Sequence, residues 1–167
     1  KDKLKIGYVG SFYFNPASER LNQTPWYKKK PYQWFQYTPF KEKWLYRSPY
    51  FVFKSVKYFL EKNPEYKTRL ELHFAGSKPA WFNDMVNEFN LEETVVHHGL
   101  IPKVETLQFQ NQMDLLLLTS SKRNERKDYS IAGKTFEYFS QIKPILAYVT
   151  EGAQKDVLSK SGISILI

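Results

Sequence analysis

Three residues in the last quarter of the chain, Gly133, Lys134 and Glu137, stand at spacings that suit a phosphorylated ligand. They lie at the start of a predicted helix over 134–140. A glycine before a helix lets the backbone approach a ligand closely, and the free N–H groups of the helix start suit a phosphate. A lysine at that end opposes the helix dipole. We therefore interpret Lys134 as an anion ligand rather than as a helix stabiliser.

Glu137 lies on the same face of this helix, three residues further on, beside Phe136 and Phe139. A carboxylate among aromatic rings is costly unless a donor reaches it. The two hydroxyls of a ribose are donors of this kind. A glutamate in a first helical turn is, however, also favoured by the helix dipole alone. The helix by itself leaves both interpretations open.

The elements that must position this helix alternate between strand and helix through most of the chain. Apolar runs that end at turn residues predict strands, and apolar residues at helical spacing predict helices. We expect strands over 3–9, 69–75, 94–97, 114–119, 144–149 and 163–167, and helices over 50–62, 81–90, 104–111, 134–140 and 154–160. This order predicts a single α/β domain, a Rossmann-like doubly wound parallel sheet with helices on both faces.

Open parallel sheets bind ligands in the loops at the carboxyl ends of their strands. The loops that hold the candidate site are therefore 10–12, 76–80, 98–103, 119–133 and 149–153. Gly10 and Ser11 lie in the first of these loops, and Gly133 ends the fourth.

The composition limits the cellular compartments and the classes of binding partner that fit this chain. The 167 residues suffice for one domain with its own core. The absence of cysteine excludes disulfides, thiolate zinc sites and a cysteine nucleophile, and it fits a reducing compartment. Without a signal-peptide pattern or a membrane-spanning run, we expect a cytoplasmic location. The formal charge of +8 indicates an anionic partner, which leaves nucleic acid, an anionic membrane surface and a phosphorylated small molecule as candidates.

An aromatic-rich insertion follows the first strand, over about residues 12–46. It has neither helical nor strand periodicity and is crowded with proline, lysine, asparagine and aromatic residues. Disordered linkers are poor in aromatics, so we expect this segment to pack on the domain as a flap over one edge. Its lysines and tryptophans also suit an interface with membrane headgroups or with a glycan acceptor, and both roles stay open.

Several motifs, in a fixed order, resemble the C-terminal donor-binding domain of GT-B glycosyltransferases, especially those of family 4. The segment KTFEYFSQIKPILA, residues 134–147, resembles the G-K-x-x-E-Y…G-K-P-[IV]-L-A block of that family. The family's earlier landmarks match Gly7 to Gly10, Leu72 to Gly76 (L-x-F-A-G), Val95 to Pro102 (V-x-x-H-G-x-I-P) and Asp114 to Leu118 (D-L-L-L-L). The resemblance covers most of the chain outside the insertion.

The resemblance implies how a donor nucleotide would be held. Glu137 matches the residue that binds the ribose hydroxyls, and the backbone around Thr135 and Phe136 matches the part that faces the diphosphate. The nucleobase would lie against the segment Leu100, Ile101 and Pro102.

The same resemblance places a basic residue near the start of the first long helix, where it clamps the diphosphate. Arg47 stands there, and a guanidinium suits two phosphate oxygens. With Lys134 it would stabilise the leaving diphosphate during catalysis. A surface arginine ahead of a helix is the alternative interpretation of Arg47.

The sugar-contacting part departs from the family pattern. Many family 4 enzymes carry an acidic residue eight positions before the second glutamate, but here that position is Tyr129, with Asp128 beside it. Either the sugar is held differently or Asp128 takes the role. The loop 120–132 also carries more positive charge than a neutral sugar requires. We expect most of these side chains to be solvated on a mobile loop: Lys122, Arg123, Arg126 and Lys127.

Together, the resemblance and these residues predict a nucleotide-sugar-binding domain of a hexosyltransferase-like enzyme. The full protein would transfer a sugar from a nucleoside-diphosphate sugar to an acceptor hydroxyl in bacterial-type polysaccharide or cell-envelope glycan synthesis. An N-terminal domain absent from this chain would hold the acceptor, a glycan or lipid-linked sugar, so we expect the isolated domain to be inactive. Peripheral contact with the inner face of the membrane is a further expectation, and no cofactor is required.

Two other functions compete with this one. A non-catalytic nucleotide-binding module of the same fold would explain Tyr129. A nucleic-acid-binding domain would use the charge and the aromatic rings, but no recognition helix or stacking sheet is visible, so we expect no nucleic-acid partner. We also expect no metal site. Adjacent residues on a strand, such as His97 and His98, point to opposite faces and cannot chelate one ion, and His73 is the one further histidine.

Overall fold

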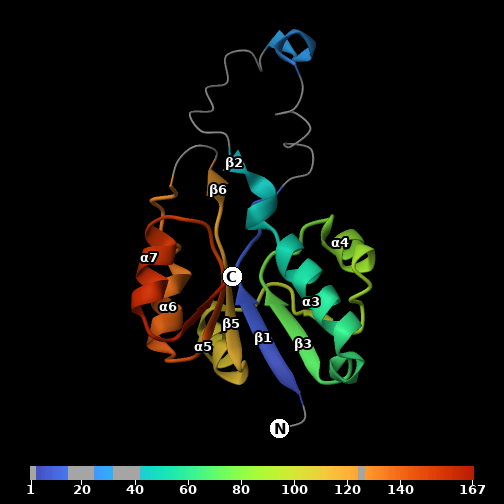
Figure 1. Ribbon diagram of the computed structural model, residues 1–167, viewed down its shortest axis with the longest axis vertical. Coiled ribbons are helices and arrows are strands. Elements are labelled where there is room, and N and C mark those ends of the chain that lie inside the picture. Colours follow the sequence, from blue (N-terminus) through green and yellow to red (C-terminus); the bar gives the residue numbers. More distant parts are fainter. Residues whose placement is uncertain (1–2, 15–24, 32–41, 124–126) are drawn as a thin grey trace.

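The computed structural model describes residues 3–14, 25–31, 42–123 and 127–167, and its centre is a six-stranded sheet of order β4-β3-β1-β5-β7-β8 (Figure 1). Every neighbouring pair in this sheet is parallel. The strands are β1 (Leu4–Val9), β3 (Leu70–Ala75), β4 (Val95–His97), β5 (Leu115–Thr119), β7 (Ile145–Tyr148) and β8 (Ser164–Leu166). The strand order reverses between β1 and β5, and open α/β sheets bind their ligands at such a reversal.

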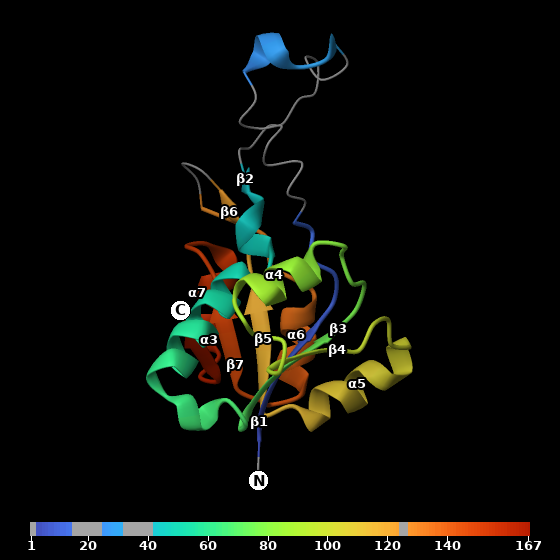
Figure 2. The same cartoon turned by 90° about the vertical axis from the view of Figure 1, so that its right-hand side faces the viewer.

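Helices cover both faces of this sheet (Figures 1 and 2). One face carries α3 (Tyr50–Lys62) and α4 (Phe82–Glu88), and the other carries α5 (Lys103–Gln112), α6 (Lys134–Ser140) and α7 (Ala153–Lys160). Each face has its own apolar core because side chains alternate along a strand. In β5, Leu117 belongs to the core under α3 and α4, whereas Leu116 and Leu118 belong to the core under the other three helices.

The expected fold class is confirmed, and each strand and helix predicted outside the insertion is present, with ends that differ by at most two residues. Local chemistry explains the start of α3. The Ser48 hydroxyl donates to the Leu45 carbonyl at 2.6 Å and accepts the Tyr50 N–H at 3.2 Å, so it fixes the turn that leads into the helix, whose N-cap is Pro49. A short 3-10 turn, η3 (Pro64–Tyr66), follows α3 before β3 begins.

A small second sheet is the element that the sequence did not predict. The strand β2 (Glu42–Lys43) pairs antiparallel with β6 (Lys122–Arg123), and a 3-10 turn, η2 (Trp44–Arg47), leads from β2 towards α3. Figures 1 and 2 both show this ribbon beyond the end of the main sheet that lies opposite the N-terminus. Residues Lys122 and Arg123 are half-buried in it, rather than solvated as the sequence suggested.

The two ends of the insertion pack on the domain as expected. Phe12 and Phe14 are buried in the core under α3 and α4, and Trp44 packs against that core. Between them, the turn η1 (Trp26–Lys28) leaves the side chain of Trp26 72% exposed, and residues 15–24 and 32–41 lie outside the described part of the chain, so the flap stays a prediction. No helix within the described residues is both long and apolar enough to span a bilayer.

Candidate functional site

A cavity of about 340 Å³ opens at the carboxyl ends of β1 and β5, where the strand order reverses. Its walls come from the loops after these two strands, from the start of α6 and from η2. Five residues that the sequence singled out line this cavity: Ser11, Arg47, Asp128, Gly133 and Lys134. The fold thus brings the predicted phosphate ligands Arg47 and Lys134 to one cavity, although they are far apart in the chain.

The side chain of Lys134 is held over an aromatic ring. Its ammonium lies 3.7 Å from the centroid of the Tyr8 ring, and no described carboxylate lies within 4.0 Å of it. Burial lowers the pKa of Lys134 to about 7, and the charge of Glu137 only partly opposes this shift. A desolvated cation that has a ring instead of a carboxylate beside it gains strongly from an anionic ligand.

Two glycines make the close packing around this lysine possible. Gly10, which follows β1, has φ +129°, and a Cβ there would lie 2.9 Å from the Lys134 Nζ. Gly76, which follows β3, has φ +143°, and its Cβ would lie 2.2 Å from the Gly10 carbonyl oxygen. The Gly10 N–H also donates to the Ala75 carbonyl at 2.8 Å. The expected donor contact at Gly10 therefore lies directly beside the Lys134 ammonium.

The first turn of α6 differs in detail from what the resemblance implied. The Thr135 N–H donates to the Ala132 carbonyl at 2.9 Å, and the Phe136 N–H donates to the Gly133 carbonyl at 3.2 Å. These bonds occupy the amides of Thr135 and Phe136 themselves, and the contact of the surrounding backbone with a diphosphate stays a prediction. The amides of Gly133 and Lys134 have no backbone acceptor among the described residues. They are the better candidates for a phosphate oxygen.

Gly133 and Thr135 play opposite parts in this turn. Gly133 has ordinary helical angles, φ −55° and ψ −35°, and a Cβ there would meet no atom within 4 Å. The space beside it is open to a ligand. Thr135 is fully buried, and its hydroxyl contacts both side-chain ends of Gln154, at 3.2 and 2.9 Å. Thr135 therefore fixes α6 to α7 through Gln154, which lines the cavity, whereas Thr135 itself is not a lining residue.

A chain of hydrogen bonds fixes the opposite wall. The Arg47 Nη2 donates to the Ser121 hydroxyl at 3.4 Å, and the Arg47 guanidinium lies 5.2 Å from the centroid of the Trp44 ring. The Ser121 hydroxyl in turn donates to the Asp128 Oδ2 at 2.7 Å. Arg47 is thereby oriented towards the cavity rather than standing as an unsupported surface arginine.

Asp128 serves the loop that carries it. Its Oδ1 accepts the N–H and the hydroxyl of Ser130 at 3.0 and 2.7 Å, and the Arg123 Nε lies 3.6 Å away. Burial raises the pKa of Asp128, but the hydrogen bonds from Ser130 and Ser121 and the charge of Arg123 outweigh it, so the pKa lies below its ordinary value. Only 3% of the residue is exposed. A direct sugar contact would have to displace these donors.

A backbone bridge ties this loop to the start of α7. Asp128 and Gly152 form an isolated parallel bridge, and the Asp128 carbonyl accepts the Ala153 N–H at 2.8 Å. Gly152 has φ +148°, and a Cβ there would lie 1.9 Å from that carbonyl oxygen. Glycine is required at this position for the two segments to meet.

The remaining predicted residues lie outside the cavity. Glu137 and Phe136 are exposed on α6, one turn beyond the cavity wall, and Tyr129 is 75% exposed. The predicted nucleobase segment, Leu100 to Pro102, precedes α5 and is mostly exposed. It is joined to the site through its neighbour Gly99, whose carbonyl accepts the Gly76 N–H at 2.8 Å.

Nine lining residues were not singled out from the sequence: Tyr8, Tyr13, Thr119, Ser120, Ser121, Ser130, Ile131, Ala132 and Gln154. Six of them carry hydroxyl groups, and five lie in the segment between β5 and α6. The available signal was their place in the loops at the carboxyl ends of β1 and β5, but nothing in their spacing separated them from ordinary loop residues.

The histidines behave as the strand alternation predicts, with one addition. The His97 ring packs against Phe82, at 4.9 Å between centroids, on the α4 side of the sheet. His98 points to the other face, where its Nε2 lies 2.9 Å from the His73 Nδ1 and His73 also contacts Glu71. The sequence did not predict this histidine pair, which forms because β3 and β4 are neighbours.

Comparison with solved structures identifies the fold. The chain aligns over its whole length with 34% of WaaG, a glycosyltransferase involved in lipopolysaccharide biosynthesis, at a TM-score of 0.57 and 14% identity. It aligns over 95% of its length with 24% of a mutant of S. aureus TarM, determined in complex with fondaparinux, α-GlcNAc-glycerol and UDP, at a TM-score of 0.53 and 12% identity. The chain therefore has the fold of one half of a GT-B glycosyltransferase and spans about a third or less of these neighbours.

No protein-family model matches the chain, and no curated protein matches it. At these identities the structural likeness defines the fold alone.

Proposed function

We propose that this chain is the donor-binding half of a glycosyltransferase that uses a nucleoside-diphosphate sugar. The observation that carries the proposal is that Arg47 and Lys134 line the same cavity, which opens where the strand order of the parallel sheet reverses. Lys134 is desolvated and lacks a carboxylate partner among the described residues. A diphosphate has two charged groups for these two cations, whereas a neutral metabolite would leave them unbalanced.

In this proposal the cavity binds the diphosphate and the sugar. The Arg47 guanidinium and the Lys134 ammonium, with the amides of Gly133 and Lys134, neutralise the charge that develops on the leaving diphosphate. Such prearranged charges stabilise the transition state more than the ground state, and no metal is needed for this step. The hydroxyl-rich wall, which includes Ser120 and Ser130, faces the same cavity and would hold the sugar.

The nucleoside would extend from the cavity along α6. Glu137 is exposed one turn after Lys134 and would accept hydrogen bonds from the ribose hydroxyls. The segment Leu100 to Pro102 would contact the nucleobase. Asp128 acts through Ser121 on Arg47 and is a positioning residue rather than a ligand of the sugar.

The whole enzyme would be a hexosyltransferase of family 4 type acting in bacterial polysaccharide or cell-envelope glycan synthesis, in the cytoplasm. A further domain of the full-length protein would hold the acceptor and complete the active site. TarM was determined with UDP in place, which supports a nucleoside diphosphate as the ligand class. We expect the isolated chain to bind the nucleotide weakly and to catalyse no transfer.

A thermal-shift panel of UDP, GDP, ADP and their sugars tests the proposal. Stabilisation by one nucleoside diphosphate, lost in Lys134→Met, is the expected result, because a ligand that binds only the native state raises the melting temperature. Lys62→Met is a matched control, since Lys62 also lies over an aromatic ring, Tyr58, but on the outer face of α3. If no nucleotide binds even to the full-length protein, the donor-site assignment is wrong.

A non-catalytic module of the same fold is the second candidate. It is favoured by one observation, that Tyr129 is exposed outside the cavity and Asp128 is already occupied, so no free carboxylate meets the sugar there. Hydrolysis or transfer of a nucleotide sugar by the full-length protein, lost in Glu137→Ala, would exclude this candidate. Nucleotide binding without either activity would support it.

A further inference from the structure

One of the two residue pairs in the ribbon of β2 and β6 places like charges opposite each other. Lys43 is paired with Lys122, and Glu42 is paired with Arg123. Like charges directly opposite destabilise an antiparallel pair, and an isolated two-stranded ribbon is at best marginally stable in water. Neither lysine has an ion pair with a described carboxylate. An anion bound near both ammonium groups would turn this repulsion into attraction.

Aromatic rings support the cations of this region. The Lys122 Nζ lies 5.2 Å from the centroid of the Tyr46 ring and donates to the Tyr46 hydroxyl at 3.5 Å. Arg47 lies over Trp44 in the same way. These contacts restrict two long side chains before any ligand binds, so less conformational entropy is lost when an anion is bound.

The nearby described carboxylates do not neutralise Lys43 and Lys122. Asp128 is buried, bonds to Ser121 and Ser130 and pairs with Arg123, and Glu151 bonds to Lys155. Apart from Arg47, which lines the donor cavity, and Arg123, which pairs with Asp128, this region carries three basic residues: Lys43, Lys122 and Lys127. The surface therefore has an excess of positive charge.

This excess lies beside the donor cavity and not inside it. Arg47 and Ser121 line the cavity, whereas Lys43 and Lys122 do not. Arg47 and Lys134 already supply the two cations that a donor diphosphate needs. The charge on the ribbon is therefore left for a second anionic group that lies next to the donor.

We propose that the β2–β6 ribbon, with η2, binds an acceptor that carries several negative charges, such as a polymer with repeated phosphate groups. This proposal rests on the donor-binding function above, because the acceptor must reach the sugar held in the adjoining cavity. It assigns part of the acceptor site to the donor-binding half and makes a neutral glycan a poor acceptor. The recognised chemistry is a row of phosphate oxygens facing Lys43 and Lys122.

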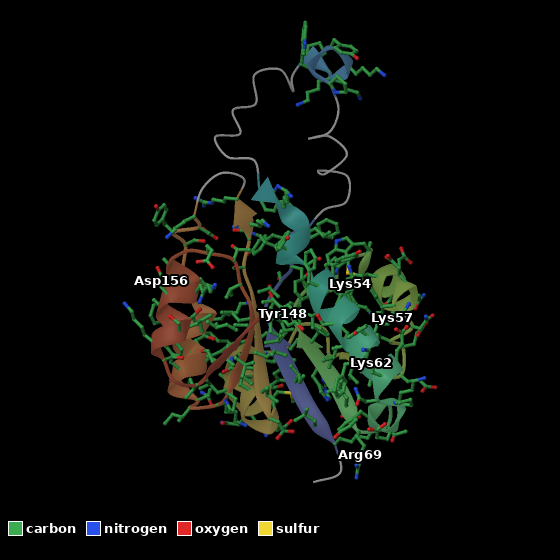
Figure 3. All side chains as sticks on the ribbon, in the orientation of Figure 1. Lys54, Lys57, Lys62, Arg69, Tyr148 and Asp156 are labelled. Carbon is green, nitrogen blue, oxygen red and sulfur yellow. The ribbon has the colours of Figure 1, made fainter. Side chains whose placement is uncertain are left out.

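The test measures the affinity of the chain for labelled short-chain inorganic polyphosphate by fluorescence anisotropy. The variant is Lys43→Gln/Lys122→Gln, and the matched control is Lys54→Gln/Lys62→Gln, whose lysines Figure 3 shows along α3. We expect the ribbon variant to bind about 25-fold more weakly, about fivefold for each cation, and the control to bind within about twofold of the parent chain. The melting temperature of Lys43→Gln/Lys122→Gln should equal or exceed that of the parent chain, because the repulsion across the ribbon is removed.

Other outcomes overturn the proposal. Equal losses in the two double variants would show that only overall charge matters. Binding to phosphatidylglycerol vesicles but not to polyphosphate would assign the ribbon to a membrane surface, and stronger binding of a single-stranded oligonucleotide would assign it to nucleic acid. The nucleotide panel is repeated on the same proteins. Polyphosphate binding by a chain that binds no nucleoside diphosphate would reject the acceptor role together with the donor function, whereas nucleotide binding without polyphosphate binding rejects the acceptor role alone.

Discussion

The ammonium of Lys134, at the start of α6, lies 3.7 Å from the centroid of the Tyr8 ring at the end of β1. This contact joins two of the elements that form the candidate donor cavity. The lysine is held in place by a ring that attracts it only weakly compared with a carboxylate. Its charge is therefore available to an incoming anion, and its protonation is sensitive to whether that anion is present.

The first prediction concerns proton uptake on nucleotide binding. The pKa of Lys134 is about 7 in the free protein, so much of the lysine is neutral at pH 8. A bound diphosphate favours the charged form and raises this pKa, so binding must take up a proton between pH 7 and 9. We expect the affinity for the nucleoside diphosphate to fall as the pH rises through this range. Calorimetry in buffers of different ionisation enthalpy measures the proton directly.

Lys134→Arg is the control for this prediction, because a guanidinium stays charged throughout the range. It should bind the nucleotide with little dependence on pH.

In the free protein, the lowered pKa of Lys134 also makes the free energy of unfolding depend on pH. Its Lys134 pKa lies below the unfolded value, so the unfolded chain binds more protons and stability rises from pH 7 to 9. Equal proton uptake by the parent chain and by Lys134→Arg would contradict the assignment.

The second prediction contrasts two glycines. Gly133→Ala introduces a Cβ into open space at helical angles, so we expect the free energy of unfolding to stay within about 0.5 kcal/mol of the parent value. The same Cβ would occupy space beside the Gly133 amide, where a phosphate of the ligand is proposed to bind, so the affinity for the nucleotide should fall about tenfold. Urea unfolding and a nucleotide titration measure the two effects on one protein.

Gly76→Ala is the opposite case. Its Cβ would lie 2.2 Å from the Gly10 carbonyl oxygen, at a φ of +143°. We expect a loss of about 2 kcal/mol or more in stability, since both strain and backbone overlap must be relieved. Should Gly133→Ala prove as destabilising as Gly76→Ala, the space beside Gly133 is not open to a ligand.

The main sheet and its helices could be predicted from the sequence because the pattern that indicates each of them lies within a single segment. The buried run Leu115 to Leu118 predicts a strand wherever it is placed, and the apolar spacing in 50–62 predicts α3 from one segment alone. Gly10, Gly133 and Lys134 could be assigned to one site because a doubly wound order brings the carboxyl ends of the strands together.

The rest depended on contacts between segments that are distant in the chain. Lys122 and Arg123 pair with β2, far earlier in the sequence, and a two-residue strand has no periodicity to detect. Asp128 looked available to a sugar because nothing local shows that Ser121 and Ser130 bind its oxygen atoms. Likewise, the bonds that occupy the Thr135 and Phe136 amides reflect the tight first turn of α6, which the residue types do not specify.

The third prediction tests Asp128 as a positioning residue. Asp128→Asn keeps the size but replaces one carboxylate oxygen by an NH2 group, which faces the donor of Ser121 or the donors of Ser130, so we expect a loss of about 2 kcal/mol in the free energy of unfolding at pH 7. The folded pKa of Asp128 is lowered, so its stabilisation is present above the unfolded pKa and is lost as the pH falls through the folded pKa. The difference between the two proteins should therefore shrink in acid.

A readout beyond stability separates positioning from mere packing. If Asp128 acts through Ser121 on Arg47, Asp128→Asn should weaken nucleoside diphosphate binding, while Asp128→Asn combined with Arg47→Met should bind no more weakly than Arg47→Met alone. Additive losses in this double-mutant cycle would show that the two residues contribute independently.

The fourth prediction separates the ribose contact from the diphosphate contact. Glu137 is exposed, and its charge has only a secondary effect on Lys134. Glu137→Ala should therefore leave the diphosphate site intact and remove the acceptor for two ribose hydroxyls. Hydrogen bonds to a charged group contribute about 2 kcal/mol, so the nucleoside diphosphate should bind about 30-fold more weakly to the variant.

The 2′,3′-dideoxy analogue should bind the parent chain and the variant equally well, because it lacks both donors. Isothermal titration of the four combinations gives the coupling energy directly. If Glu137→Ala weakens the dideoxy nucleotide as much as the ribonucleotide, Glu137 acts through the charge of Lys134 or the start of α6, and the ribose lies elsewhere.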